Sequence, residues 1–143
     1  MKNYIWDFDG TLFDTYPAMV DGAWQALKDF GISMDKNHRL TESTWGLLKE
    51  HRLAHLIEEV VGIDQDFPRK PDPASLNYLI DTFHLERTDT MMIGDRRLDI
   101  EAGKNAGVAT CLYDIDHFLG EIPADYVVGN LNEILTLQSI IKK

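Results

Sequence analysis

The sequence predicts an α/β fold, namely a doubly wound parallel sheet with helices on both faces. Short apolar segments typical of strands alternate along the chain with segments of helical periodicity, and such alternation usually forms a parallel sheet. With 143 residues, 44% of them hydrophobic, the chain has the length of one domain and enough apolar side chains for one buried core. We therefore expect a single domain over residues 1–143.

The chain opens on a strand and a helix. Residues 4–8 are mostly aromatic or β-branched, and the Asp-Gly-Thr at 9–11 predicts that this buried strand ends in a tight loop. Over residues 17–30 apolar side chains recur at helical spacing, and Gly31 follows, which predicts an amphipathic helix with a glycine stop. The recurring positions are Val20, Ala23, Trp24 and Leu27.

Two helices of the second half have recognisable features. Asp72 is placed to cap a helix whose first position is Pro73, and apolar residues follow on one face. This face holds Leu76, Leu79, Ile80 and Phe83. A second helix is predicted over residues 98–106, where the small Ala102 and Gly103 indicate close packing.

Three more strands and a last helix complete the predicted fold. The strands are short, apolar and separated by turn residues. They are predicted at residues 90–93, 109–113 and 126–128. Asn130 and Glu133 have the spacing of a capping box, which predicts a helix to about residue 141. Residues 41–61 are predicted to be mostly helical, although their periodicity is poor.

Composition excludes several classes of partner. Asp and Glu number 24 against 14 Lys and Arg, for a formal net charge of -10, and no basic block offers a footprint for phosphate backbones. Nucleic acid and anionic membrane are therefore not expected partners. A single cysteine, Cys111, permits no intrachain disulfide, and no apolar run has membrane-spanning length. We expect a cytoplasmic protein, with its oligomeric state left open.

Four carboxylates lie where ligands bind in parallel α/β sheets, at the carboxyl ends of strands. Asp7 and Asp9 end the first predicted strand and share a face. Asp95 and Asp99 follow a later strand and lie one helical turn apart. Four such charges repel one another unless a cation lies among them. Carboxylate oxygens suit Mg²⁺, and Lys70 supplies a further positive charge.

These residues occur in stretches that resemble the motifs of the haloacid dehalogenase superfamily. Residues 7–15 resemble its first motif, residues 70–73 its third and residues 94–99 its fourth, in the same order. Residues 100–107 are also similar to phosphoglycolate phosphatase-like and β-phosphoglucomutase-like members. The resemblance implies a Rossmann-like core and a phosphatase that hydrolyses a small phosphorylated metabolite.

The resemblance also implies roles for individual residues. Asp7 would be the nucleophile that forms an aspartyl-phosphate, Asp9 the general acid and base, and Lys70 the clamp on nucleophile and phosphate. The implied Mg²⁺ ligands are Asp7, Asp9, Asp95 and Asp99. Gly10 and Thr11 at the strand end can offer backbone N–H groups to phosphate. Arg96 and Arg97 are expected to be solvated.

The resemblance is incomplete between the first and third motifs. The superfamily's second motif is a Thr or Ser that ends a hydrophobic strand, and residues 30–70 contain no such strand. Hydroxyl residues at 41–44 are better explained as helix caps. The interval is also too short for a cap domain plus two core strands, because each strand-helix unit takes about 30 residues.

We therefore expect a helical cap-like insert over about residues 15–56 that is reduced or incompletely represented. Three explanations stay open: a natural minimal protein, a degenerate relative, or a sequence from which internal residues are left out. We favour the third, which predicts a break between consecutive Cα atoms near residues 38–39 or 51–52.

Alternative functions also stay open. A phosphosugar mutase of the β-phosphoglucomutase kind would differ in rearranging a hexose phosphate instead of releasing phosphate. A non-catalytic relative would keep the metal site without turnover. A phosphoacceptor signalling module is disfavoured, because its acidic pair and its phosphorylated Asp lie on different strands, whereas Asp7 and Asp9 share one.

Overall fold

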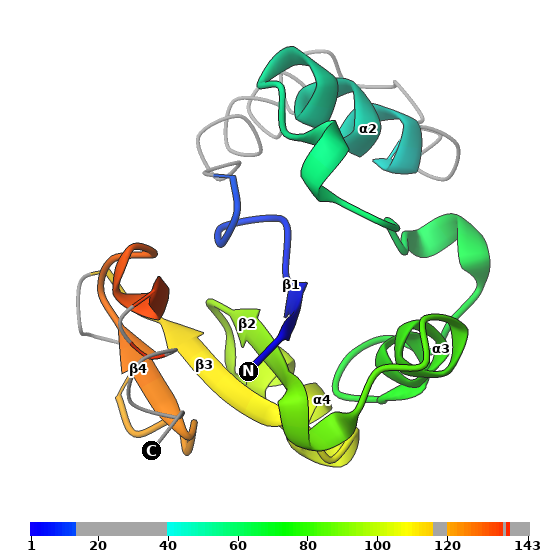
Figure 1. The fold of residues 1–143 in the computed structure, drawn as a ribbon. Coiled ribbons are helices and arrows are strands. Elements are labelled where there is room, and N and C mark those ends of the chain that lie inside the picture. The colour runs from blue at the N-terminus through cyan, green and yellow to red at the C-terminus, as the bar shows by residue number, and fades with distance from the viewer. Residues whose placement is uncertain (14–39, 116–119, 136, 138–143) are drawn as a thin grey trace, which may run out of the picture.

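The computed structural model describes residues 1–13, 40–115, 120–135 and 137 (Figure 1). Four parallel strands form one sheet in the order β1-β2-β3-β4. The strands are β1 (Asn3–Trp6), β2 (Thr90–Gly94), β3 (Ala109–Tyr113) and β4 (Tyr126–Val128). The predicted parallel α/β sheet is confirmed, and each of the four strands lies within two residues of its predicted ends.

The sheet is buried at its centre. Every residue of β2 is buried, because β2 pairs with β1 on one side and β3 on the other. The register aligns Ile5 with Met92 and Ile93 with Cys111. Apolar and β-branched side chains at these positions are what a strand covered on both faces requires.

Helices α3 (Ala74–Thr82) and α4 (Arg97–Asn105) pack on one face of the sheet. Their shared core holds Ile5, Leu76, Ile80, Met92, Ala102, Ala106 and Val108. On the other face, Ile134 and the partly buried Leu131 and Leu137 cover Met91 and Ile93. The sheet is therefore covered on both faces, as a doubly wound fold requires.

Single residues explain the start of α3 and the close packing of α4. Helix α3 begins at Ala74 with Pro73 at the N-cap position, one residue later than predicted. The Asp72 carboxylate still accepts the backbone N–H of Ala74 at 2.9 Å. A Cβ at Gly103 would lie 2.7 Å from Thr110 Cγ2, which confirms the predicted close packing of α4 on the sheet.

The region before α3 differs from its prediction. Helix α2 (Leu40–Glu50) ends before a left-handed residue, Arg52, with φ 59°. Beyond a single 3-10 turn at Ala54–Leu56, residues 57–62 form neither helix nor strand. The expected helix to residue 61 is therefore wrong after Glu50, because β-branched Val60 and Val61 favour extended backbone.

Several predictions concern residues that the structure does not describe. The expected helix at 17–30, most of the expected insert and the possible break at 38–39 lie outside the described residues. The other possible break was predicted near residues 51–52. There the backbone hydrogen bonds of α2 continue past the end of the helix, because Leu53 N donates to Leu48 O at 2.7 Å. Among the described ranges, no helix is long and apolar enough to cross a lipid bilayer.

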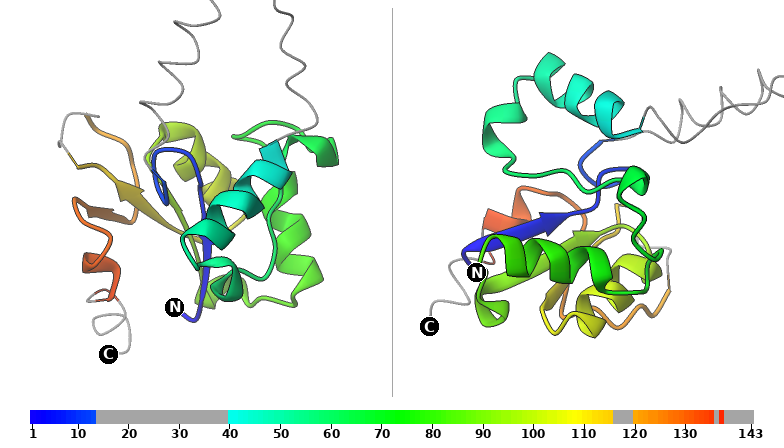
Figure 2. Two further views of the ribbon diagram at one scale, coloured as in Figure 1. Left: turned by 90° about the horizontal axis from the view of Figure 1, so that it is seen from above. Right: turned by 90° about the vertical axis from the view of Figure 1, so that its right-hand side faces the viewer.

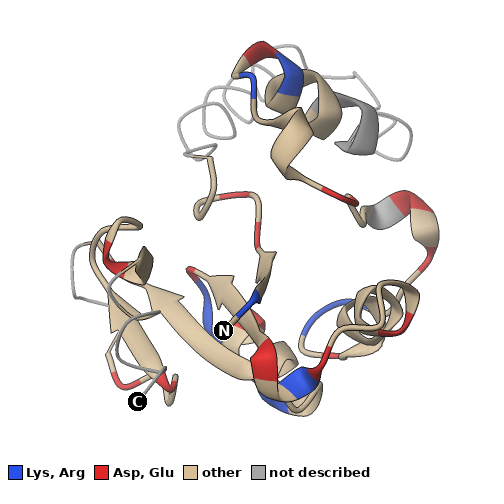
Figure 3. Cartoon of the chain, viewed as in Figure 1, with Lys and Arg blue, Asp and Glu red and all other residues tan. Residues whose placement is uncertain are grey.

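Helix α2 lies on the far side of β1 from the helices that pack on the sheet. The right-hand view of Figure 2 shows β1 between α2 and the helices α3 and α4. Within the described residues β1 pairs only with β2, and residues of β1 and α2 line one hollow. Figure 3 shows the Lys and Arg positions interspersed with acidic ones along the drawn chain.

Candidate active site

The first site residue follows β1 directly. Asp7 N donates to Ile93 O at 2.8 Å, which extends the pairing of β1 and β2 and fixes the direction of the Asp7 side chain. Asp7 is only 7% exposed. Its carboxylate therefore lies at the carboxyl end of the sheet, where ligands bind in parallel α/β folds.

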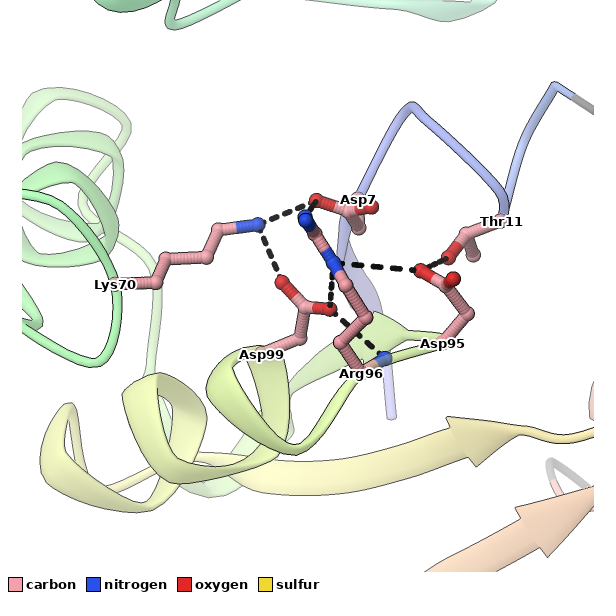
Figure 4. A network of polar contacts seen from close by, with 6 residues as sticks. All are labelled: Asp7, Thr11, Lys70, Asp95, Arg96 and Asp99. Carbon is pink, nitrogen blue, oxygen red and sulfur yellow. Dashed lines mark hydrogen bonds and ion pairs between the residues drawn. The ribbon is translucent and has the colours of Figure 1, made fainter. Parts of the chain in front are cut away.

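Three carboxylates meet at this edge and form what we call the acidic cluster: Asp7, Asp95 and Asp99. One oxygen of each lies within 4.8 Å of the others. Asp95 follows β2, and Asp99 lies in the first turn of α4 (Figure 4). Asp9, the fourth predicted metal ligand, does not join this group. It lines a hollow together with Asp7 and Lys70.

Lys70 binds two members of the acidic cluster. Its ammonium lies 2.5 Å from Asp7 Oδ1 and 2.7 Å from Asp99 Oδ1. Lys70 comes from the segment before α3, and Asp99 from the start of α4, so this ion pair ties two elements to the end of β1. The sequence predicted a cation here, and the structure places one between the two acids.

Arg96 is exposed, as expected, but it is also part of the site, which the sequence did not predict. Its guanidinium forms ion pairs with Asp7, Asp95 and Asp99 at 3.6 to 4.0 Å. Arg97 is exposed as well, but its guanidinium donates to the backbone oxygen of Glu121 at 3.1 Å instead. Arg96 lies three residues before Asp99, which is about one helical turn, whereas Arg97 lies two residues before it. This spacing is the sequence signal that could have separated the two arginines.

Burial changes the pKa of Asp7 and acts on that of Lys70. It raises the pKa of Asp7 to about 6, although the positive charges of Lys70 and Arg96 oppose this shift. For Lys70, burial alone would lower the pKa, but attraction by Asp7 and Asp99 outweighs it, and the pKa is raised. Lys70 is therefore a permanent cation near neutral pH, beside a carboxylate that ionises less readily than usual.

One oxygen of Asp7 lacks a protein partner. Asp7 Oδ2 is buried and accepts no hydrogen bond from the described residues. A buried carboxylate oxygen without a donor is unfavourable unless something else binds it. The position of this oxygen beside two further carboxylates is that expected of a ligand for a hard cation.

The loop after β1 brings Thr11 to the cluster. Gly10, with φ 80°, allows the tight turn, and its N–H donates to Phe13 O at 2.7 Å. The predicted phosphate donor at Gly10 is thus committed to the loop in this structure. The buried Thr11 donates its hydroxyl to Asp95 Oδ1 at 3.1 Å, which orients that carboxylate.

A hollow of about 900 Å³ extends from the site along β1 towards α2. Its polar end includes Asp7, Asp9 and Lys70. Its remaining walls are largely apolar, and among the side chains that form them are Leu12, Leu47, Leu48, Ile57, Val60, Leu76 and Phe83. The site can therefore receive a ligand whose charged group faces the carboxylates and the lysine.

Gly94 makes room for Asp99. A Cβ at Gly94 would lie 2.3 Å from Asp99 Cβ, which no rotamer change of Asp99 can relieve. We expect Gly94→Ala to lower the free energy of unfolding by about 2–3 kcal/mol through overpacking. Urea denaturation measures this change.

Gly46→Ala is the matched control for this prediction. Gly46 lies in α2, and a Cβ there meets nothing within 4 Å, so alanine should leave stability unchanged or raise it by up to about 1 kcal/mol. Equal denaturation midpoints for the two variants would contradict the steric role of Gly94.

Sequence comparisons assign the chain to a family. A profile described as haloacid dehalogenase-like hydrolase matches residues 36–113. The phosphoglycolate phosphatase of Vibrio cholerae is 41% identical over 100 residues, which cover 65% of this chain and 44% of that protein. Pyrophosphatase PpaX of Listeria monocytogenes is 32% identical over 127 residues, covering 82% and 58%. The protein belongs to the haloacid dehalogenase-like hydrolase family, and it spans about half the length of these curated relatives.

Solved structures share the fold. A superfamily hydrolase of subfamily IA from Geobacter sulfurreducens aligns with a TM-score of 0.75 at 17% identity, over 96% of this chain and 99% of that one. A chain of similar length therefore carries the same fold. YfnB from Bacillus subtilis, solved bound to magnesium, aligns with a TM-score of 0.61 at 25% identity, over 68% of this chain and 45% of that one.

Proposed function

We propose that the protein is a Mg²⁺-dependent phosphatase that hydrolyses a small phosphate monoester through an aspartyl-phosphate on Asp7. The observation that carries this proposal is the buried Asp7 carboxylate, with Lys70 at 2.5 Å and two further carboxylates within 4.8 Å. Both relatives described above are named as phosphatases, one of phosphoglycolate and one of pyrophosphate.

The acidic cluster fits a divalent cation. It offers three carboxylates, and Asp7 Oδ2 is buried with no hydrogen-bond donor among the described residues. Asp7, Asp95 and Asp99 would hold Mg²⁺, and the magnesium-bound YfnB supports this choice of ion. When bound, Mg²⁺ supplies positive charge that reduces the repulsion between a carboxylate and a phosphate dianion.

The first chemical step belongs to Asp7 and Asp9. An Asp7 oxygen attacks phosphorus and forms a P–O bond, while the bond between phosphorus and the leaving oxygen breaks. Asp9 gives its proton to that leaving oxygen. In the second step Asp9 takes a proton from water, the water oxygen attacks phosphorus, and the Asp7–phosphorus bond breaks to release phosphate.

In the first step Lys70 would hold both the Asp7 carboxylate and the phosphate group. Its ammonium is fixed by Asp7 and Asp99 and has a third N–H for a phosphate oxygen. Thr11 remains a proposed phosphate donor. A second-motif hydroxyl is not assigned within the described residues.

The test is phosphate release by the purified chain. We expect release from p-nitrophenyl phosphate, and from one of phosphoglycolate or pyrophosphate, to fall by a factor on the order of 10² or more when EDTA removes Mg²⁺. Added Mg²⁺ should restore it. Absence of phosphate release from every compound would defeat the proposal. Rearrangement of a hexose phosphate without loss of phosphate would favour the mutase.

A further inference from the structure

Arg96 reaches every member of the acidic cluster. Its guanidinium lies 3.6 Å from Asp7 Oδ1, 3.6 Å from Asp99 Oδ2 and 4.0 Å from Asp95 Oδ1 (Figure 4). Three carboxylates this close repel one another, and Lys70 supplies one compensating charge. Arg96 supplies a second, so the two cations together balance two of the three negative charges.

The same carboxylates are the ones that fit a divalent cation. A guanidinium and a metal ion that draw on the same three acids compete for their oxygens, and their positive charges repel each other at this range. The guanidinium and the metal ion therefore cannot both make close contacts with these carboxylates at the same time.

Arg96 is held less firmly than Lys70. Lys70 makes hydrogen bonds of 2.5 and 2.7 Å to the acidic cluster, and its side chain is 26% exposed. The ion pairs of the Arg96 guanidinium with the same cluster are 3.6 Å or longer, and the Arg96 side chain is 50% exposed. An exposed long side chain can leave an ion pair at little cost in burial. Of the two cations, Arg96 is the one that can move away.

The start of α4 does not depend on the guanidinium. The backbone N–H of Arg96 donates to Asp99 Oδ2 at 3.1 Å, and this bond caps the helix whatever the side chain does. Movement of the guanidinium therefore leaves the first turn of α4, and with it the position of Asp99, in place.

We propose that Arg96 is a displaceable counter-ion, which neutralises the acidic cluster in the metal-free protein and gives way to the divalent cation. The inference rests on the metal site of the proposed function. The inference can be tested by the affinity for Mg²⁺, because displacement of the guanidinium opposes metal binding. This affinity is measured without substrate, so it does not depend on phosphate hydrolysis.

Calorimetric titration with Mg²⁺, without substrate, tests the inference on wild type, Arg96→Gln and Arg97→Gln. The two variants lose the same charge at adjacent positions, but Arg97 contacts only the backbone of Glu121 among the interactions described above. We expect Arg96→Gln to bind Mg²⁺ about tenfold more tightly than wild type, and Arg97→Gln to stay within about twofold.

Thermal unfolding gives a second readout. In EDTA, Arg96→Gln should unfold at a lower temperature than Arg97→Gln, because the acidic cluster then lacks one counter-ion. Saturating Mg²⁺ should raise the unfolding temperature more in Arg96→Gln than in wild type, since tighter binding to the native state stabilises it further.

The outcomes separate this inference from the proposed function. Equal or weaker Mg²⁺ binding by Arg96→Gln, compared with Arg97→Gln, would overturn the inference and leave the metal site standing. No Mg²⁺ binding by any of the three proteins would overturn both. If Arg96→Gln does not fold, the NMR signal of the Arg96 Nε–H in wild type decides. It should shift on Mg²⁺ addition more than that of Arg97, and an unmoved signal would overturn the inference.

Discussion

Asp7→Asn should lower phosphate release by a factor on the order of 10⁴ or more. In the proposed mechanism Asp7 is the nucleophile that accepts phosphate, and an amide cannot act in this way. Release of p-nitrophenol under saturating Mg²⁺ measures the loss. Retained hydrolysis would mean that another residue accepts phosphate.

The same variant should keep its fold and gain stability in metal-free buffer. The pKa of Asp7 is raised from 3.8 to about 6, so the native state binds a proton more tightly than the unfolded state does. Ionised Asp7 therefore costs stability above about pH 6, and this cost disappears below about pH 4. We expect Asp7→Asn to exceed wild type by on the order of 1–3 kcal/mol at pH 7.5.

Asp81→Asn is the control for both measurements. It makes the same isosteric change at an exposed position of α3, so turnover and the pH profile of stability should match wild type. A stability gain for Asp7→Asn that persists at pH 3.5 would contradict the raised pKa as its cause.

Lys70→Met should reduce kcat/KM by a factor of about 10² to 10⁴ and lower the free energy of unfolding by about 3 kcal/mol. Methionine keeps much of the side-chain volume but removes the charge that binds Asp7 and Asp99. Removing one partner of a buried ion pair leaves the remaining charges uncompensated, which is strongly destabilising. Chemical denaturation in EDTA and phosphatase assays with Mg²⁺ measure the two effects.

Lys2→Met tests whether the loss is specific to the site. Lys2 pairs with Asp89 at 2.9 Å, but its side chain is 80% exposed, and such exposed pairs contribute little to stability. Stability and activity should therefore stay close to wild type. Similar losses in both lysine variants would argue that charge balance over the whole protein, and not the contacts of Lys70, is responsible.

The strands and the acids at their ends could be predicted because their signals are local. A buried parallel strand needs only a short apolar run, and an acid directly after such a run must lie at the carboxyl end of the sheet. Asp7 and Asp95 are of this kind. Asp99 could be added because helical spacing places it one turn from Asp95.

Contacts between distant segments could not be predicted in the same way. The ion pair of Arg96 with Asp7 depends on how closely the ends of β1 and β2 approach, and the sequence holds no measure of that distance. The Gly10 amide was expected to face phosphate, but the geometry of the loop turns it to Phe13. The end of α2 at Glu50 also escaped prediction, because a left-handed Arg52 carries no strong sequence signal.

The pairing of β1 with β2 has a consequence for how the chain folds. Asn3 and Thr90 are 87 residues apart, whereas β2 and β3 pair through the much shorter α4 connection. Closing the longer loop costs roughly 1 kcal/mol more in chain entropy. We therefore expect β2 and β3 to pair, with α4 between them, before β1 joins the sheet. During synthesis Asp7 is made before Lys70 and Asp99, and it can reach these partners only after the chain has been made past Asp99.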